Sequence, residues 1–381
     1  MNAHEFAHQS LRTRLVLRAG AIHALREELG RLGVHRPLLL TSPRTARSAL
    51  YATVQDLLQD GIALSVSDIP AHSSVQTVTR IADAARRAQI DGVVAVGGGS
   101  VSDTAKAVTL LLAEGGELAQ HASRFVPPRE VIIPALLAPK LPIVSIPVTA
   151  SGAEVTPSFG IRTDAGTKLL FWDAQLASRV VLADPAATHE IPAALLLSTA
   201  MNGLAHCIEG LYSTACSPIA SVLALDATRR FGSAMRELAR DPQSEAARAE
   251  LMLAAHMSGM VLASARSCLH HAICHVLGAT FGVPHGAANA VILPHAVRFN
   301  APAAQAEADA AAHALGGNDL PACLTALQAD TGVPTRLRDL GIARDALPAV
   351  AHHVMGERGL AFNPRPVARP DDVLSILVAA W

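Results

Sequence analysis

A run of three glycines directly after a short β-branched stretch is the feature that most constrains the fold of this chain. Residues 91–96 (DGVVAV) have the pattern of a buried strand, residues 97–100 (GGGS) that of a tight turn, and residues 101–114 that of a helix. The flanking sequence continues the alternation, with strands expected at 37–41, 63–66 and 141–148 and helices at 45–59 and 75–89. Such alternation predicts a parallel sheet with crossover helices.

The second half of the chain has a different character. After Pro185, Ala- and Leu-rich segments such as 193–214 and 244–277 carry helical periodicity and few strand signals. A length of 381 residues, half of them hydrophobic and only 17% charged, suits two cores better than one. We therefore predict an α/β domain at residues 1–187 and an all-α domain at residues 188–381.

Charge and cysteine content exclude several classes of function. The formal net charge is -1 and no basic run is present, which argues against nucleic-acid binding. Five cysteines without a CxxC pair form neither a disulfide framework nor a thiolate metal site. The sequence contains no apolar run of roughly 18 residues and no signal-peptide pattern at its start, so we expect no membrane association and a cytoplasmic location.

The glycine turn at 97–100 is a predicted anion site. Glycine lets the backbone approach a ligand closely, and the amides and dipole of the following helix favour an anionic group, most naturally a pyrophosphate. The spacing is not the GxGxxG of an ordinary Rossmann fold. The alternative is a tight strand-to-helix turn that holds no ligand.

Lysine is rare in this chain, which makes each one informative. Only Lys106, Lys140 and Lys168 occur among 31 basic residues. Asp103 and Lys106 are three residues apart and share a face of the helix after the glycine turn. We expect a role at the site for at least one of these two, the alternative being a carboxylate that serves the helix dipole and a lysine that pairs with it.

Histidines cluster in the second half with helical spacing. Asn202 and His206 are four residues apart, as are His271 and His275, and His285 follows a Gly-Val-Pro turn. Three neutral imidazoles from two helices and a loop could hold Zn²⁺ or Fe²⁺ with an open position for substrate. The alternative is that these are buried histidines of the core.

The string GGGSVSDTAK resembles the GGGSxxDxxK signature of the iron-type alcohol dehydrogenases, dehydroquinate synthases and glycerol dehydrogenases. The resemblance implies an N-terminal α/β dinucleotide-binding domain with a parallel sheet and an all-α C-terminal domain. The segment 146–157 (IPVTASGAEVTP) resembles the loop that lines the nicotinamide in that superfamily. The implied contacts to NAD(P) are Ser42, Gly97, Gly98, Gly99, Ser100, Asp103, Val148, Thr149, Ser151 and Lys168.

One departure from the superfamily bears on the choice of cofactor. Many relatives end the strand at 37–41 with Thr-Asp, whose carboxylate binds the adenosine ribose, but Ser42 stands here in its place. Without that carboxylate a 2′-phosphate is not repelled, and Arg44 or Arg47 could attract it. We predict that the protein accepts NADPH in addition to NADH.

A second departure bears on the metal. The resemblance implies His206, His271 and His285 as ligands of a divalent ion and places His275 beside the substrate. Asn202 stands where the family has a ligand aspartate, and an amide is a poorer ligand for a hard divalent cation. We therefore expect no stoichiometric iron or zinc.

The same replacement, within MN-x-x-AHC and LHH-x-x-CH, resembles maleylacetate reductases, which work without the metal. The resemblance implies a homodimeric enzyme of aromatic-compound catabolism that uses NADH or NADPH to reduce maleylacetate, a small carboxylated enone, to 3-oxoadipate. His275 would be the acid or the group that polarises the substrate. The predicted catalytic set is His275, His271, His206, His285 and Asn202.

Other features leave the substrate open. The sequence at 171–173 (FWD) lacks the Gly-Arg-Asp loop of many maleylacetate reductases, and 286–289 (GAAN) resembles alcohol dehydrogenases. The alternatives are a metal-dependent alcohol dehydrogenase or aldehyde reductase, a dehydroquinate synthase-like lyase and, more remotely, a non-catalytic dinucleotide-binding module. For a carboxylated substrate, Lys106, Arg162 and Arg298 are the cationic partners considered.

Overall fold

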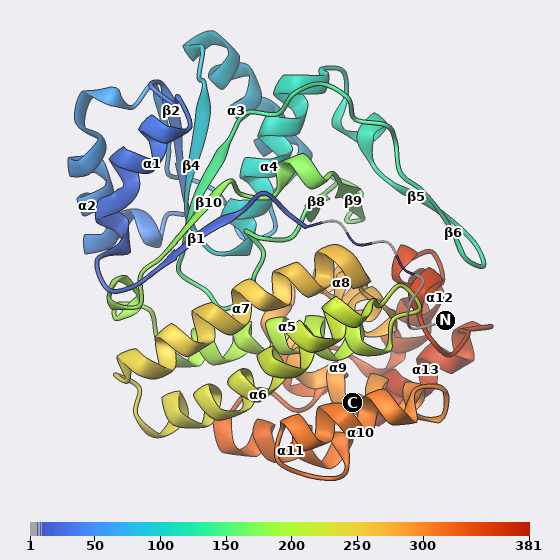
Figure 1. The fold of residues 1–381 in the computed structure, drawn as a ribbon. Helices are drawn as coiled ribbons and strands as arrows, with labels where there is room; N and C mark the ends of the chain where they lie inside the picture. The colour runs from blue at the N-terminus through green and yellow to red at the C-terminus, as the bar shows by residue number, and fades with distance from the viewer. Residues whose placement is uncertain (1–5, 7, 9) are drawn as a thin grey trace. The chain divides into compact units, whose positions relative to one another are not determined.

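A computed structural model describes residues 6, 8 and 10–381, and its chain divides into two compact units (Figure 1). The α/β unit comprises Leu11–Ser123 and Ile133–Ile191, and the helical unit comprises Arg124–Ile132 and Pro192–Trp381. The segment Arg124–Ile132 therefore groups with the helices although it precedes them by some sixty residues in sequence. No helix among the described residues has both the length and the apolar character needed to cross a bilayer.

The α/β unit is built on a six-stranded parallel sheet (Figure 1). From one edge to the other its strands are β1 (Arg14–Leu17), β10 (Val180–Ala183), β7 (Ile143–Pro147), β4 (Gly92–Gly97), β2 (Pro37–Thr41) and β3 (Leu64–Val66). The parallel sheet and the strands β2, β3, β4 and β7 were predicted from the sequence and are confirmed. Strand β10 was not predicted. Gly97 of β4 lies opposite Pro147 of β7, so the loops after these two strands begin side by side.

Four helices belong to the α/β unit. They are α1 (Leu25–Arg31), α2 (Ala49–Leu58), α3 (Val75–Ala88) and α4 (Gly99–Glu114). Serine starts two of them, since the hydroxyl of Ser48 accepts from the amide of Tyr51 and that of Ser74 from the amide of Thr77, both at 3.2 Å. Helix α4 begins at Gly99, two residues earlier than expected, so part of the glycine turn is the first turn of the helix.

Two antiparallel hairpins were not predicted from the sequence. They pair β5 (Arg124–Val126) with β6 (Glu130–Ile132) and β8 (Ser158–Arg162) with β9 (Lys168–Trp172). Short 3-10 helices occupy several connections, among them η2 (Thr45–Arg47), η6 (Ala186–Thr188) and η10 (Arg358–Phe362).

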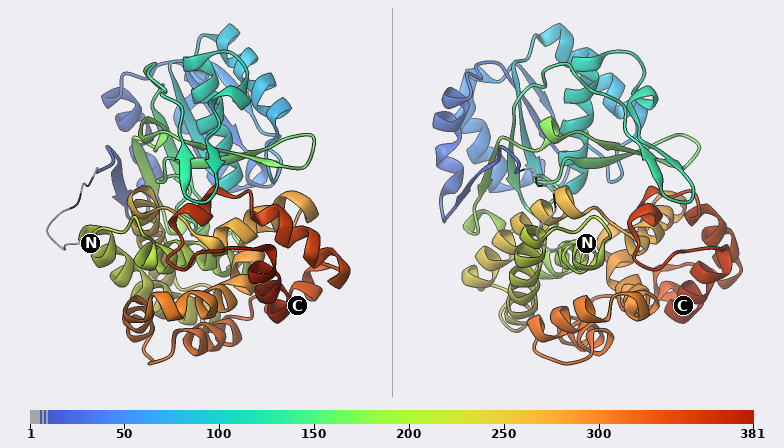
Figure 2. Two further views of the ribbon diagram at one scale, coloured as in Figure 1. Left: turned by 90° about the vertical axis from the view of Figure 1, so that its right-hand side faces the viewer. Right: turned by 45° about the vertical axis from the view of Figure 1, so that its right-hand side comes forward.

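The helical unit contains nine α-helices among its described residues (Figure 2). They are α5 (Ala193–Tyr212), α6 (Pro218–Arg240), α7 (Glu245–Ala265), α8 (Leu269–Phe281), α9 (His285–Asn300), α10 (Gln305–Ala314), α11 (Leu320–Thr331), α12 (Leu347–Val354) and α13 (Pro370–Ala380). The expectation of one helical segment over 244–277 was wrong, because the chain breaks between α7 and α8 at Arg266, whose φ is 68°. No glycine or proline marks this break, so the periodicity gave no sign of it.

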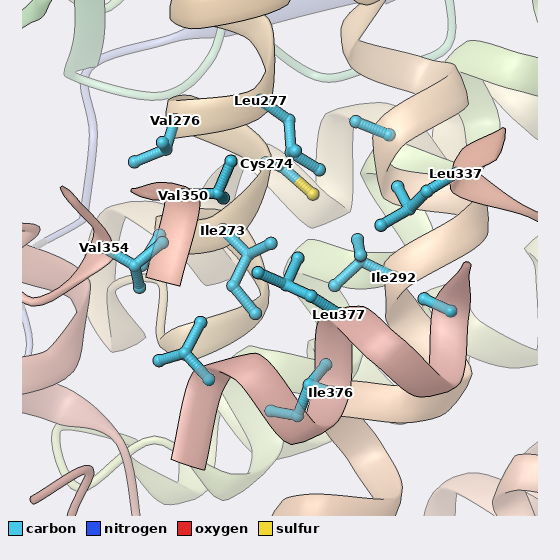
Figure 3. Close-up of a cluster of buried hydrophobic side chains, with 14 of the residues drawn as sticks. Ile273, Cys274, Val276, Leu277, Ile292, Leu337, Val350, Val354, Ile376 and Leu377 are labelled. Carbon is cyan, nitrogen blue, oxygen red and sulfur yellow. The ribbon is translucent and has the colours of Figure 1, made fainter. Parts of the chain in front are cut away.

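A hydrophobic core fixes the orientation of α8 (Figure 3). Ile273 and Leu277 of α8 are fully buried against Ile292 of α9 and Leu377 of α13. His271 and His275 are each offset by two residues from Ile273 and Leu277, which places them on the other side of the helix. Ile273 and Leu277 therefore anchor one face of α8 in the core, and His271 and His275 lie on the opposite face.

Candidate functional site

The glycine turn and the loop after β7 touch within the α/β unit. A Cβ on Gly98 would lie 2.8 Å from Cγ2 of Thr149, and one on Gly97 would lie 2.7 Å from Cγ2 of Val101. The amide of Val148 donates to the carbonyl of Gly97 at 3.2 Å. Only glycine permits this approach, so the two segments that the sequence analysis assigned to a dinucleotide form one surface at the carboxyl ends of β4 and β7.

The polar side chains of this surface are tied into the backbone. The Ser100 hydroxyl accepts from the amide of His72 at 3.2 Å, and the Thr149 and Ser151 hydroxyls lie 3.5 Å apart. Ser42, at the carboxyl end of β2, accepts from the amide of Thr45 at 3.3 Å.

Lys106 has a structural role instead of the ligand-binding role considered from sequence. It is fully buried, and its ammonium donates to the carbonyls of Ala153, Thr156 at 2.7 Å and Ser158 at 3.4 Å. Its three protons are directed at three carbonyls, which argues against Lys106 as the cationic partner of a substrate carboxylate, one of the three possibilities considered from sequence. Burial lowers the pKa of Lys106 to about 8 despite the nearby Asp103 carboxylate.

Asp103 and Lys168 also hold the segment that follows the loop at residues 148–157. A carboxylate oxygen of Asp103 accepts from the amide of Gly160 at 3.2 Å. The Lys168 side chain lies where a Cβ on Gly160 would be, so this glycine makes room for the lysine. Both residues therefore connect to β8, in addition to any contact with a cofactor.

The predicted histidines come together in the helical unit. The rings of His206 and His271 stack with centroids 4.7 Å apart, and those of His275 and His285 stack at 5.8 Å. His271 connects the two pairs, with its centroid 6.1 Å from that of His275 and 5.9 Å from that of His285. His285 is the first residue of α9 rather than part of a loop. Spacing of four residues on α8 thus predicted a real cluster.

Asn202 contacts this cluster directly. Oδ1 of its side-chain amide lies 3.1 Å from Nε2 of His271, and both side chains are buried. An amide can present its NH2 group to an unprotonated ring nitrogen or its oxygen to a protonated one, whereas an ionised carboxylate can only accept.

A buried carboxylate that the sequence analysis missed lies on the other side of His271. Oε2 of Glu209 is 2.5 Å from Nδ1 of His271, and the same carboxylate accepts from the amides of Cys268 at 3.1 Å and His270 at 2.8 Å. Burial would raise the pKa of Glu209, but His271 and His270 hold it well below its ordinary value. Burial lowers the pKa of His271 to about 4. Glu209 is therefore ionised, and His271 is neutral with its proton on Nδ1, a state in which the Asn202 amide donates to Nε2 through its NH2 group.

His275 has a carboxylate partner that was also missed. Its Nδ1 lies 3.2 Å from Oε2 of Glu357, and both residues are partly buried. A carboxylate at Nδ1 favours the tautomer with the proton on that nitrogen and leaves Nε2 unprotonated. Eighty-two residues separate the two side chains, so no local pattern links them.

The residues present fit a tightly held divalent ion poorly. In residues 6, 8 and 10–381, the one trio of potential ligands whose donor atoms lie within 4.8 Å of one another is Glu209, His270 and His271, and these atoms already bond each other or backbone amides. Nδ1 of His206 is buried and has, within the described part of the chain, no hydrogen-bond partner of the kind that a metal-bound histidine normally has.

Comparison with known proteins covers nearly the whole chain. Residues 12–185 match the iron-containing alcohol dehydrogenase family, and residues 196–381 match the C-terminal domain of the Fe-containing alcohol dehydrogenase family. A maleylacetate reductase of Sphingobium indicum is 32% identical over 368 residues, which cover 96% of this chain and 94% of the relative.

Solved structures are also similar to this chain over nearly its whole length. The maleylacetate reductase of Agrobacterium tumefaciens superposes with a TM-score of 0.83 at 28% identity, covering 99% of this chain and 98% of the other. An iron-containing alcohol dehydrogenase of Corynebacterium glutamicum gives 0.84 at 29% identity, covering 100% and 97%. Both groups are thus similar to this chain along its full length.

Proposed function

Because the chain belongs to the iron-containing alcohol dehydrogenase family and is an oxidoreductase, we propose that it reduces maleylacetate to 3-oxoadipate with NADH or NADPH. The observation that carries this proposal is Asn202, whose amide lies against Nε2 of His271 at the position where metal-dependent relatives have a ligand carboxylate. The proposal includes a cytoplasmic homodimer in aromatic-compound catabolism.

The chemistry needs three things from this chain. Bound NAD(P)H would supply a hydride to the carbon β to the ketone of the enone. Negative charge then develops on the ketone oxygen, and a nearby donor must stabilise it. The carbon between them must finally receive a proton, which gives the saturated keto acid.

The histidine cluster offers suitable groups for the second and third tasks. His275, oriented by Glu357, would protonate the carbon or polarise the ketone, and we assign it the leading role. Neutral His271 lies between Asn202 at Nε2 and the ionised Glu209 at Nδ1, which together fix the orientation of its ring. His206 and His285 stack on these two rings and limit their rotation.

The cofactor would bind through the α/β unit. The glycine turn would take the pyrophosphate, with Val148, Thr149 and Ser151 near the nicotinamide and Lys168 near its ribose. Arg44 and Arg47 are exposed near Ser42, where a 2′-phosphate would need a cation. This supports the use of NADPH beside NADH.

A metal-dependent reductase of simple aldehydes is the second candidate. The GAAN string at 286–289 favours it, whereas the poor fit of the ligand set disfavours it. A lyase resembling dehydroquinate synthase would need cations for a phosphate, yet Lys106 is buried on carbonyls and Lys140 bonds Glu114 at 2.5 Å.

An NAD(P)H oxidation screen tests the proposal. Maleylacetate should be consumed with stoichiometric loss of NAD(P)H and formation of 3-oxoadipate, and uncharged aldehydes should react far more slowly. Preference for an aldehyde would favour the metal-dependent candidate, and a transient change in NADH without net consumption would favour the lyase.

A further inference from the structure

The face of α5 that carries the site residues begins with a serine. Ser198, Asn202 and His206 are spaced four residues apart, so their side chains lie in one row along the helix. Asn202 contacts His271 and His206 stacks on the same ring, so this row faces the histidine cluster. Ser198 lies one helical turn before Asn202 and extends the row of polar side chains by one position.

The first turn of α9 packs directly on Ser198. A Cβ on Gly286 would lie 2.4 Å from the carbonyl oxygen of Ser198 and 2.6 Å from its hydroxyl oxygen, so only glycine permits this approach. Gly286 directly follows His285, whose ring stacks on that of His275 with centroids 5.8 Å apart. The contact therefore places the Ser198 hydroxyl beside the start of α9, from which the His285 ring reaches His275.

The residues of the cluster differ in their access to solvent. His206 and His271 are buried, whereas Ser198, His275 and His285 are partly exposed. A ligand that enters from solvent therefore meets the cluster at its three partly exposed residues. Ser198 is the one of these three that is not a histidine, and it is uncharged at every pH of interest.

The hydroxyl of Ser198 is not used by its own helix. Serine and threonine within a helix often donate to a carbonyl three or four residues earlier. Thr199 donates in this way to Leu196 at 3.1 Å, and Ser233 of α6 donates to Arg229 at 3.2 Å. Within residues 6, 8 and 10–381, the Ser198 hydroxyl has no hydrogen-bond partner. An accessible donor beside the histidine cluster is therefore available to a ligand.

We propose that the Ser198 hydroxyl donates a hydrogen bond to a carboxylate of the substrate at the partly exposed end of the histidine cluster. The inference rests on the proposed function, since maleylacetate offers a ketone, which the histidines would polarise, and two carboxylates, which need other donors. Hydrogen bonds to an ionised acceptor are shorter and stronger than those between neutral groups. Of the cationic partners considered from sequence, Lys106 is committed to carbonyls and Arg298 is exposed near the other end of α9.

Binding of succinate to the full-length protein with NADP⁺ present, measured by calorimetry, tests the contact without turnover. Ser198→Ala should weaken succinate binding by about tenfold, because it removes a donor to a charged acceptor. Ser233→Ala is the matched control, since this hydroxyl bonds its own helix, and it should bind succinate as the parent does. The Kd for NADPH should be the same in all three proteins.

Thermal melting separates loss of the contact from loss of the fold. Alanine is a better helix former than serine, so Ser198→Ala should melt at the same temperature as the parent or higher while it loses affinity. The proposal would be overturned by a parent protein without saturable succinate binding, by a Ser198→Ala variant that binds as the parent does, or by an equal loss in Ser233→Ala.

Kinetics distinguish failure of this contact from failure of the proposed function. A carboxylate remote from the reacting carbons is bound equally in the ground state and the transition state, so Ser198→Ala should raise the KM for maleylacetate about tenfold and leave kcat within about twofold. If maleylacetate is reduced with an unchanged KM in this variant, the serine contact is wrong and the proposed activity stands. If maleylacetate is not reduced while succinate binding still depends on Ser198, the contact stands and another carboxylated carbonyl compound is the substrate.

Discussion

Nδ1 of His271 lies 2.5 Å from the buried carboxylate of Glu209, and the same carboxylate accepts from the first backbone amides of α8. One side chain of α5 thus fixes both where α8 starts and which nitrogen of His271 carries the proton. The orientation of His271 and the stability of the helical unit are therefore linked through Glu209.

Replacing Glu209 by Gln tests this link. The amide keeps the shape but loses the charge that three donors share, so we expect a loss of about 1–3 kcal/mol in the free energy of unfolding and a lower kcat/KM for maleylacetate. Urea titration and steady-state kinetics measure the two effects. Glu27→Gln, at an exposed pair with Arg31, is the control and should change neither. If Glu209→Gln has the same free energy of unfolding and the same kcat/KM as the parent, Glu209 does not link stability to activity.

Replacing His275 by Ala tests its assigned role. A lost proton donor lowers rates by about 10²–10⁴-fold, so kcat/KM should fall that far while the Kd for NADPH, measured by fluorescence titration, stays the same. Glu357→Gln should give a smaller fall, because it changes only the orientation and the proton affinity of the ring. His352→Ala, at an exposed position on α12, is the control. Near-normal turnover of His275→Ala would exclude this histidine from the mechanism.

Replacing Ser42 by Asp tests the account of cofactor choice. The new carboxylate would bind the adenosine ribose and repel a 2′-phosphate, so the ratio of kcat/KM for NADPH to that for NADH should fall at least about tenfold. The parent should use both cofactors. A preference of the parent for NADH above about 100-fold, equivalent to roughly 2.7 kcal/mol, would contradict the account.

His256 of α7 gives a prediction for acid stability. Its ring is buried, Nδ1 has no hydrogen-bond partner within the described part of the chain, and burial lowers its pKa from 6.5 to about 4. Between these values the unfolded chain binds a proton that the folded protein does not, so stability present above pH 6.5 is lost towards pH 4, by at most roughly 3 kcal/mol.

Urea titrations at pH 7 and pH 4.5 measure this effect. His256→Leu removes the titrating group, so it should lose less stability than the parent between the two pH values. Equal losses in parent and variant would show that the ring does not contribute.

The sequence predicted those parts of the fold and site that depend on local patterns. The β-branched run before GGGS predicted β4 and α4. The spacing of four residues predicted that His271 and His275 share one face of a helix. The rarity of lysine drew attention to Lys106. Its role, donating to three carbonyls of a loop, could not be predicted because these contacts form only in the folded chain.

What the sequence did not reveal depends on long-range contacts. Glu357 contacts His275, which is 82 residues away in sequence. The helix break at Arg266 contains no glycine or proline that would predict it. Glu209 could have been found, because it is the one acidic residue of α5. A single acid there indicates a buried partner.

Asn202 is the residue on which the metal-free account depends. Asn202→Asp places a carboxylate next to His271, so this variant should bind Zn²⁺ or Fe²⁺ more tightly than the parent and should lose activity towards maleylacetate when the metal is removed. Metal analysis after dialysis measures the first effect.

The most direct test is the kcat/KM for maleylacetate of the parent protein after exhaustive chelation, with the metal content determined on the same sample. The account predicts unchanged activity in protein that holds no stoichiometric metal. Activity that disappears with the metal and returns when Fe²⁺ or Zn²⁺ is added back would contradict it.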